Sequence, residues 1–184
     1  RYWDEVHGLV PPDKFIPLLE KERLIRYVDL FIFEQVLHQM QTWHRQGTSL
    51  FPISLNFSRI TLLDGDLLDE MLNICSRYPE APKNFIQIEL TERIGDVERE
   101  IIAQIGRSIR EQGFLLGLDD FGSQYSSLSL LTYMKLDTIK LDKSLIWNLE
   151  TSLNCRIMVK NIVRMCLELG IECLAEGVET TKQL

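Results

Sequence analysis

The sequence predicts an α/β fold, in which helices cover a parallel β-sheet, and two observations lead to this prediction. First, five strand-like segments are separated mostly by segments of helical periodicity, an alternation that is typical of βαβ units. Second, each of the five strands ends in polar side chains that can bind a ligand. An open doubly wound sheet gathers such groups mainly at one switch point, whereas a closed barrel brings every strand end to one mouth. The pattern therefore favours a (β/α) barrel.

The helices are predicted from apolar residues at helical spacing and from signals at their ends. The first begins at Pro11-Pro12-Asp13, and the second covers 27–43 and ends before Gly47. Further helices are expected over 65–75, between Asp96 and Gly113, over the short segment 128–134, and over 154–169 before Gly170.

The strands are predicted from short apolar runs that lie between these helices. They cover 50–57, 85–90, 114–118, 138–141 and 171–175. In the second of these segments, apolar residues alternate with Gln87 and Glu89.

Composition argues against several classes of protein. The 184 residues suggest one domain over 1–184, and 45% hydrophobic residues are enough for a sizeable core. A net charge of −7 argues against a DNA-binding surface, and the lack of an apolar run of about 18 residues argues against a membrane span. The four cysteines have no CxxC spacing, as expected for reduced residues of a cytoplasmic protein. The three histidines are scattered and form no zinc pattern.

The segment Gly117-Leu118-Asp119-Asp120-Phe121-Gly122 is the most informative stretch of the chain. The strand 114–118 delivers two adjacent carboxylates and then ends at Phe121-Gly122. Adjacent Asp residues repel each other, and a divalent cation between them removes that cost. The pattern predicts a divalent-metal site, with a simply solvated strand end as the alternative.

Ligand-type side chains follow all five strands. They are Asn56, then Glu89 with Glu92, Asp119 with Asp120, Lys140 with Asp142, and Glu176 with Glu179. Carboxylate and amide oxygens without thiolate or imidazole favour Mg²⁺ or Mn²⁺ over zinc. Two such ions about 3.5–4 Å apart support phosphoryl chemistry, because they turn a bridging water into hydroxide. Asp119 is the best bridging ligand, since a second carboxylate follows it, and Lys140 is the best cation for the attacking water or the phosphate.

Structural roles stay open for some of these residues. Lys140 can be an ordinary ion-pair partner of Asp142 or Asp119, and Asn56 can cap the turn after its strand. Glu89 lies in an apolar strand, where an unpaired carboxylate is costly, so a purely structural role is less favoured for it. Two glutamates are expected around the site rather than as direct metal ligands: Glu92 and Glu179.

Together, these residues resemble the EAL domain, the cyclic di-GMP phosphodiesterase family, along essentially the whole chain. The motifs that carry the resemblance are Arg1 with Gly8 and Pro12, Phe15-Ile16-Pro17, Leu55-Asn56-Phe57-Ser58, Glu89-Leu90-Thr91-Glu92, Asp119-Asp120-Phe121-Gly122, Tyr125-Ser126-Ser127-Leu128, Lys140-Leu141-Asp142 and Ala175-Glu176-Gly177-Val178-Glu179-Thr180. Each motif alone is modest, but their order and spacing are highly specific. The resemblance implies a modified TIM-type (β/α) barrel that hydrolyses one phosphodiester of cyclic di-GMP to linear pGpG with Mg²⁺ or Mn²⁺.

The resemblance also implies a role for each site residue. The implied metal ligands are Asn56, Glu89 and Asp119 for the first of two ions, and Asp119, Asp120 and Glu176 for the second. Lys140 would hold the hydrolytic water or the phosphate. Arg1 resembles an arginine that contacts the ligand phosphate. Glu92 resembles a glutamate that anchors the loop 121–127, which in the family couples dimerisation to metal binding.

The sequence departs from the family pattern in three ways. The Glu-Ala-Leu motif, whose glutamate is a metal ligand, would lie just before Arg1. The last strands of the family would follow Leu184, so we expect a barrel that is incomplete at both ends of this chain. Gln124 stands where the family loop usually has glycine, whose positive φ a glutamine tolerates poorly, and this predicts weaker coupling of the loop to the metal.

Other functions are also compatible with the sequence. One alternative is a receptor that binds cyclic di-GMP without cutting it, and another is a domain that merely dimerises. Without the resemblance, a metal-dependent enolase-like lyase also fits lysine and carboxylates at barrel strand ends.

Family members often dimerise beside a diguanylate cyclase or sensory domain. We therefore expect a cytoplasmic domain, or the cytoplasmic part of a membrane-anchored protein, with such partners.

Overall fold

The computed structural model describes residues 2–6, 8–91, 98–123 and 128–183. The chain packs as two compact units, one formed by Arg1–Leu50 with Phe57–Ala81 and the other by Phe51–Asn56 with Pro82–Leu184. The single domain that we predict over 1–184 stays a prediction. None of the helices in the described ranges combines the length and the apolar character that a bilayer span requires.

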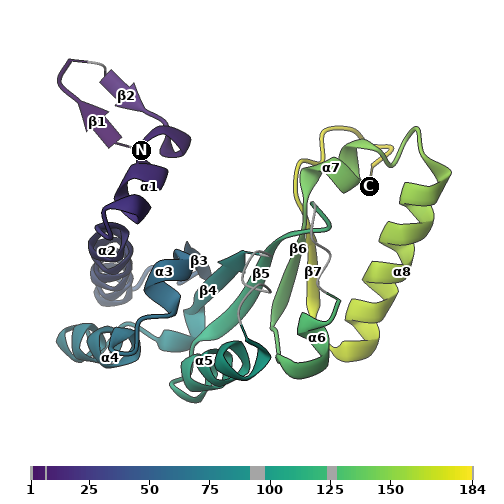
Figure 1. Ribbon diagram of the computed structural model, residues 1–184. Helices are drawn as coiled ribbons and strands as arrows, with labels where there is room; N and C mark the ends of the chain where they lie inside the picture. Colours follow the sequence, from purple (N-terminus) through teal and green to yellow (C-terminus); the bar gives the residue numbers. More distant parts are fainter. Residues whose placement is uncertain (1, 7, 92–97, 124–127, 184) are drawn as a thin grey trace. The chain divides into compact units, whose positions relative to one another are not determined.

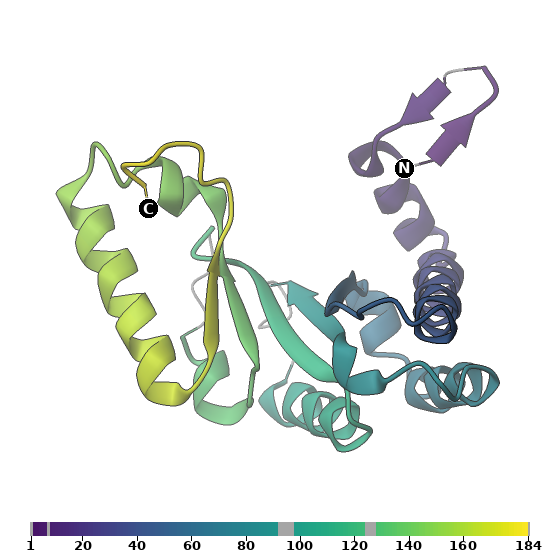
Figure 2. The same cartoon turned by 180° about the vertical axis from the view of Figure 1, so that it is seen from behind.

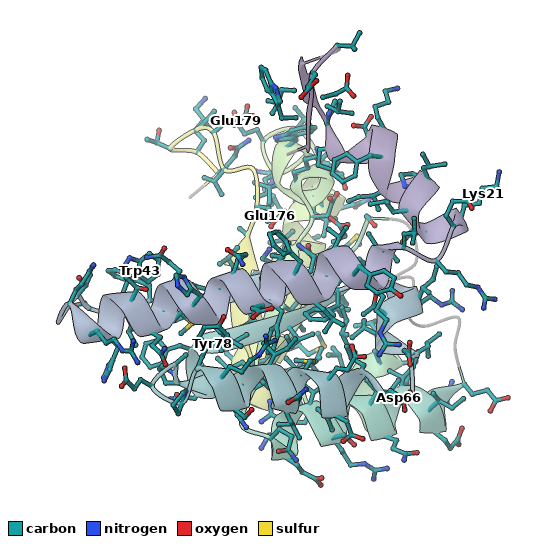
Figure 3. All side chains as sticks on the ribbon, turned by 90° about the vertical axis from the view of Figure 1, so that its left-hand side faces the viewer. Lys21, Trp43, Asp66, Tyr78, Glu176 and Glu179 are labelled. Atoms are coloured by element: carbon teal, nitrogen blue, oxygen red, sulfur yellow. The ribbon has the colours of Figure 1, made fainter. Side chains whose placement is uncertain are left out.

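The first unit consists of a hairpin and four helices (Figure 1). Its elements are the antiparallel strands β1 (Tyr2–Asp4) and β2 (Gly8–Val10), followed by α1 (Pro12–Lys21), α2 (Ile25–Arg45), α3 (Arg59–Leu62) and α4 (Leu67–Arg77). On α2, apolar residues at helical spacing face the core: Phe33, Leu37 and Met40 are fully buried, and Leu30 and Val36 are half-buried. Figure 3 shows α2 and α4 side by side, and the hydroxyl of Tyr78, after α4, donates to Glu34 on α2 at 2.9 Å.

A buried carboxylate fixes the start of α3 in this unit. Oδ2 of Asp29, on α2, accepts hydrogen bonds from the backbone N–H of Ser58 at 3.0 Å and from Oγ1 of Thr61 at 2.6 Å. Ser58 is the N-cap of α3, because its Oγ accepts from the N–H of Thr61 at 3.1 Å. Burial raises the pKa of Asp29, and the bonds from Thr61 and Ser58 oppose that rise. These bonds therefore stabilise a charge that burial alone disfavours.

The second unit is a parallel sheet with helices alongside it (Figures 1 and 2). Its strands are β3 (Ile53–Asn56), β4 (Ile86–Thr91), β5 (Leu115–Phe121), β6 (Thr138–Leu141) and β7 (Glu172–Ala175). Its helices are η1 (Lys83–Phe85), α5 (Arg99–Glu111), α6 (Leu130–Tyr133), α7 (Lys143–Trp147) and α8 (Leu153–Leu169). Helix α8 runs beside β7, and α5 packs against β5.

The strand order agrees with an arc of a barrel. The order is β3-β4-β5-β6-β7, so every neighbouring pair in the sheet is also consecutive in the unit. A doubly wound sheet would instead reverse its order at a switch point. In the part of the chain that the structure describes, β3 and β7 form the two edges. Because all pairs are parallel, the carboxyl ends of the strands share one edge, which is the upper one in Figure 1.

Strand β4, between β3 and β5, is buried along almost its whole length. Ile86, Ile88 and Leu90 are at most 1% exposed, and the polar Gln87 and Glu89 between them are also buried. Strands of a parallel sheet are covered on both faces and are therefore nearly continuous apolar runs. Two buried polar residues in such a strand need partners, and those partners lie at the site described below.

Several boundaries differ from the prediction. Strand β3 is shorter than the predicted 50–57, whereas β5 continues past Leu118 to Phe121 through a register shift. The hairpin, α3 and α7 were not predicted. Helices α3 and α7 span only about one turn, and β1 and β2 have three residues each, so their periodicity gives little signal in the sequence.

We predict that Thr61→Val lowers the free energy of unfolding by about 1–2 kcal/mol, because valine keeps the shape but removes the hydroxyl that donates to buried Asp29. Thr61→Ser keeps that hydroxyl and is the matched control, with a smaller loss. Urea denaturation measures both variants. A valine variant as stable as the wild type would contradict the role given to this hydrogen bond.

Candidate metal centre

The strand register brings the predicted ligands to one face of the sheet. Asn56 on β3 is paired with Glu89 on β4, and Thr91 is paired with Asp119 on β5. Residues two apart on a strand share a face, and partners on adjacent parallel strands do as well. Asn56, Glu89 and Asp119 therefore lie on one face at the carboxyl edge of the sheet.

Lys140 on β6 lies among three carboxylates at this edge. Its Nζ is 3.0 Å from Oε1 and 3.1 Å from Oε2 of Glu89, whose side chain is 1% exposed. The same Nζ is 3.0 Å from Oε1 of Glu176 and 3.5 Å from Oδ1 of Asp119. Burial lowers the pKa of Lys140, but the hydrogen bonds to Glu89 and Glu176 outweigh it, so the pKa is raised. The lysine is therefore held charged beside the predicted ligands.

Three carboxylates meet next to this lysine. Asp119, Asp120 and Glu176 each offer an oxygen within 4.8 Å of the others. The backbone produces this arrangement, because Asp120 has a φ of 56° at the register shift between β5 and β6. Aspartate accepts the left-handed conformation more readily than most residues. The N–H of Asp120 also donates to Oδ1 of Asp119 at 3.0 Å, which fixes one carboxylate against the next peptide.

The electrostatics of the cluster suit a divalent cation. Burial raises the pKa of Asp119; the nearby charge of Lys140 opposes this rise, and that of Glu89 adds to it. Burial also raises the pKa of Asp120, and the carboxylates of Asp142 and Glu176 raise it further. A cation at the cluster would offset this repulsion. The donors are hard oxygens, so the residues fit Mg²⁺ or Mn²⁺.

The structure also tests the purely structural roles that the sequence left open for Lys140 and Asn56. Lys140 does pair with Asp119, whereas Oδ1 of Asp142 accepts from the N–H of Ser144 and caps α7. Ser58, not Asn56, caps the helix that follows β3. The Asn56 side chain is exposed at the carboxyl end of β3, beside Glu89 in the register.

For the other residues that we predict around the site, the contacts of the described residues show no link to the cluster. Arg1, Glu92 and Gln124 lie outside the described residues. Glu179 is exposed on the segment after β7, where its N–H donates to Oε1 of Gln183 at 2.7 Å. Figure 3 labels it and Glu176 on this segment. The roles assigned to all these residues stay predictions.

Sequence reasoning missed Gln87 as part of the site. Its Nε2 lies 3.3 Å from Oε1 of Glu89, and its Oε1 accepts from Thr138. One signal was present in the sequence, since Gln87 interrupts an apolar strand two residues before Glu89. Residues two apart on a strand share a face. A polar side chain two positions before the buried Glu89 therefore indicates a hydrogen-bond partner of that glutamate.

Comparisons with known proteins agree with this architecture. The family model described as the EAL domain matches residues 1–184. The "Probable cyclic di-GMP phosphodiesterase PdeG" of Escherichia coli (strain K12) is 33% identical over 183 residues, which are 99% of this chain and 36% of PdeG. The "Bifunctional diguanylate cyclase/cyclic di-GMP phosphodiesterase MucR" of Pseudomonas aeruginosa is 30% identical over 177 residues, 96% of this chain and 26% of MucR. The chain thus spans well under half the length of these relatives.

A solved structure confirms the predicted fold class. The structure described as "PaMucR Phosphodiesterase, c-di-GMP complex" matches with a TM-score of 0.90 at 28% identity. The match covers 100% of this chain and 74% of that chain. The chain therefore has the modified TIM barrel fold of EAL domains, over part of the length of that structure.

We predict that Lys140→Met destabilises the protein in EDTA by about 3–5 kcal/mol, because it leaves the buried Glu89 carboxylate without its cation. Adding Glu89→Gln to this variant should recover part of the loss, since the uncompensated charge is then gone. Arg164→Met is the matched control, because Arg164 pairs with Glu168 on an exposed helix face and such pairs contribute about 0–1 kcal/mol. Equal losses for Lys140→Met and Arg164→Met in denaturant unfolding would refute the charge argument.

Proposed function

Since this chain belongs to the EAL domain family, we propose that the protein hydrolyses cyclic di-GMP to linear pGpG with two divalent cations, Mg²⁺ or Mn²⁺. The observation that carries the proposal is the cluster of Asp119, Asp120 and Glu176 within 4.8 Å, next to the ammonium of Lys140. The name of MucR describes that relative as a cyclic di-GMP phosphodiesterase, and the name of PdeG describes it as a probable one. The PaMucR structure is described as a complex with c-di-GMP.

The residues divide naturally between two ions. Asn56 and Glu89 are register partners on adjacent strands, and Asp119 lies on the same face, so these three residues are assigned to the first ion. Asp120 and Glu176 are assigned to the second, with Asp119 shared because it belongs to the carboxylate cluster as well. When bound, two such ions acidify a water and neutralise charge on the phosphate.

Lys140 has the geometry of a positioning cation. Contacts of 3.0 Å to both Glu89 and Glu176 fix its Nζ, so the ammonium can orient the hydrolytic water or a phosphate oxygen. The oxygen of that water forms a bond to phosphorus while one ester P–O bond breaks. The departing ribose oxygen takes up a proton, and linear pGpG is left.

Two further residues are assigned by family resemblance alone. Arg1 would contact a phosphate of the substrate, and Glu92 would anchor the loop 121–127. Both residues lie outside the described ranges. A charged arginine suits a phosphate, because its guanidinium can donate two parallel hydrogen bonds.

A second candidate function is a receptor that binds cyclic di-GMP without cleaving it. The presence of Gln124 in place of the usual loop glycine favours this alternative, because glutamine resists a positive φ. A receptor would bind the nucleotide in EDTA and release no pGpG with Mn²⁺. Accumulation of pGpG would exclude it.

Assembly and location are further parts of the proposal. We expect a homodimer and a neighbouring diguanylate cyclase or sensory domain, an arrangement that the name of MucR describes in part. A cytoplasmic location agrees with the four free cysteines, since thiols stay reduced in that compartment.

We predict that Asp119→Asn or Lys140→Ala raises the barrier to hydrolysis by about 2–4 kcal/mol, because each change removes a group that stabilises charge at the reacting phosphate. This corresponds to a loss of about 30- to 1,000-fold in kcat, measured as pGpG formed in the presence of Mn²⁺. Lys160→Ala, at an exposed position of α8, is the matched control and should keep full activity. EDTA should abolish turnover. Unchanged rates in both site variants would overturn the assigned roles.

A further inference from the structure

A second layer of residues lies directly beneath the candidate metal centre, toward the amino ends of the strands. Four strands each place one residue of this layer two positions before a site residue. The pairs are Ser54 with Asn56, Gln87 with Glu89, Gly117 with Asp119, and Thr138 with Lys140. Since residues two apart share a face, the layer lies on the face that carries the site. In the register, Ser54 is paired with Gln87, and Gly117 with Thr138.

Gln87 connects this layer. Its side chain is buried, and its Nε2 donates to Oγ of Ser54 at 3.1 Å and to Oε1 of Glu89 at 3.3 Å. Its Oε1 accepts from Oγ1 of Thr138 at 2.7 Å. One amide thus joins β3, β4 and β6, and both its nitrogen and its oxygen are used. The hydroxyl of Thr138 points a donor at the amide oxygen, which turns the amide nitrogen toward Glu89.

Gly117 provides the space that this amide occupies. A Cβ at position 117 would lie 2.7 Å from Nε2 and 2.9 Å from Cδ of Gln87. Contacts below 3.0 Å are repulsive, so a side chain on Gly117 would displace the amide from its place across β5. Two independent residues, Gly117 and Thr138, therefore favour the same position of Gln87.

We propose that Gln87 is a positioning residue that fixes the carboxylate of Glu89 for metal binding. Lys140 contacts both oxygens of Glu89, and Gln87 donates to Oε1 alone. The amide therefore distinguishes the two oxygens and restricts rotation of the carboxylate. The inference rests on the proposed function, since it takes Glu89 as a metal ligand. Partners that orient a ligand side chain in this way typically change metal affinity or activity by about 10- to 100-fold when they are removed.

The first test is Gln87→Met, which keeps the length of the side chain and removes the amide. Mn²⁺ affinity, measured by calorimetry on the purified protein, should fall by about 10- to 100-fold, and kcat should fall with it. Gln41→Met is the matched control, because Gln41 is also a buried glutamine and accepts from the N–H of Glu80 at 3.3 Å in the other unit. If Gln87 is merely structural, both variants will lose stability and neither will lose Mn²⁺ affinity.

A double-mutant cycle tests the role of Gly117 separately. Gly117→Ala should reduce Mn²⁺ affinity in the wild type, where the new methyl group displaces Gln87. The same change should have little effect in Gln87→Ala, where there is no amide to displace. Thr138→Val should lower Mn²⁺ affinity less than Gln87→Met does, and Thr138→Ser should bind Mn²⁺ with the affinity of the wild type. An equal effect of Gly117→Ala in both backgrounds would contradict the inference.

Failure of the inference can be told apart from failure of the proposed function. If the wild type binds Mn²⁺ and forms pGpG but Gln87→Met does both equally well, only the inference is wrong. If the wild type does neither, the proposed function is wrong. Crystal structures of the two metal-free proteins then test the part of the inference that remains, that Gln87 fixes the Glu89 carboxylate. A reoriented Glu89 carboxylate in Gln87→Met supports it, and an unchanged carboxylate refutes it.

Discussion

The carboxylate of Glu89 is buried within a parallel sheet, and the arrangement of the site depends on how this charge is stabilised. An isolated buried carboxylate is costly, and it persists only with a cation and hydrogen bonds. Lys140 supplies the cation at 3.0 Å, and its remaining contacts reach Glu176 and Asp119. The lysine on β6 therefore brings together side chains from three other segments, namely β4, β5 and the end of β7. In this view the same contacts that make a buried charge tolerable also assemble the donors for a metal.

The period of the parallel strands explains why two functional layers lie one above the other. Residues two positions apart face the same side, so a strand that contributes Glu89 also contributes Gln87, and β6 contributes Thr138 below Lys140. Within the lower layer, Thr138 donates to Gln87 across strands, and Gln87 in turn donates to Glu89 of the upper layer on its own strand. On the adjacent strand β5, Gly117 has no side chain and therefore leaves room for the amide of Gln87.

Much of this arrangement was predictable, for physical reasons that differ between residues. The bounds of β6 were predicted correctly, and polar residues at the strand ends indicated that Glu89, Asp119, Asp120, Lys140 and Glu176 would meet, because parallel strands share a carboxyl edge. The conformation of Asp120 was not predictable, since its φ of 56° goes with the register shift between β5 and β6. Gln87 was missed because two of its partners, Ser54 and Thr138, lie on other strands and depend on register. Short α7 shows no period.

The central claim is that the carboxyl edge of this sheet holds two divalent ions that share Asp119. Anomalous diffraction from crystals of the protein soaked in Mn²⁺ tests it most directly. The account predicts two anomalous peaks, one in contact with Asn56, Glu89 and Asp119 and the other in contact with Asp119, Asp120 and Glu176. Crystals with no peak at these residues, or with a single peak that does not touch Asp119, would contradict it.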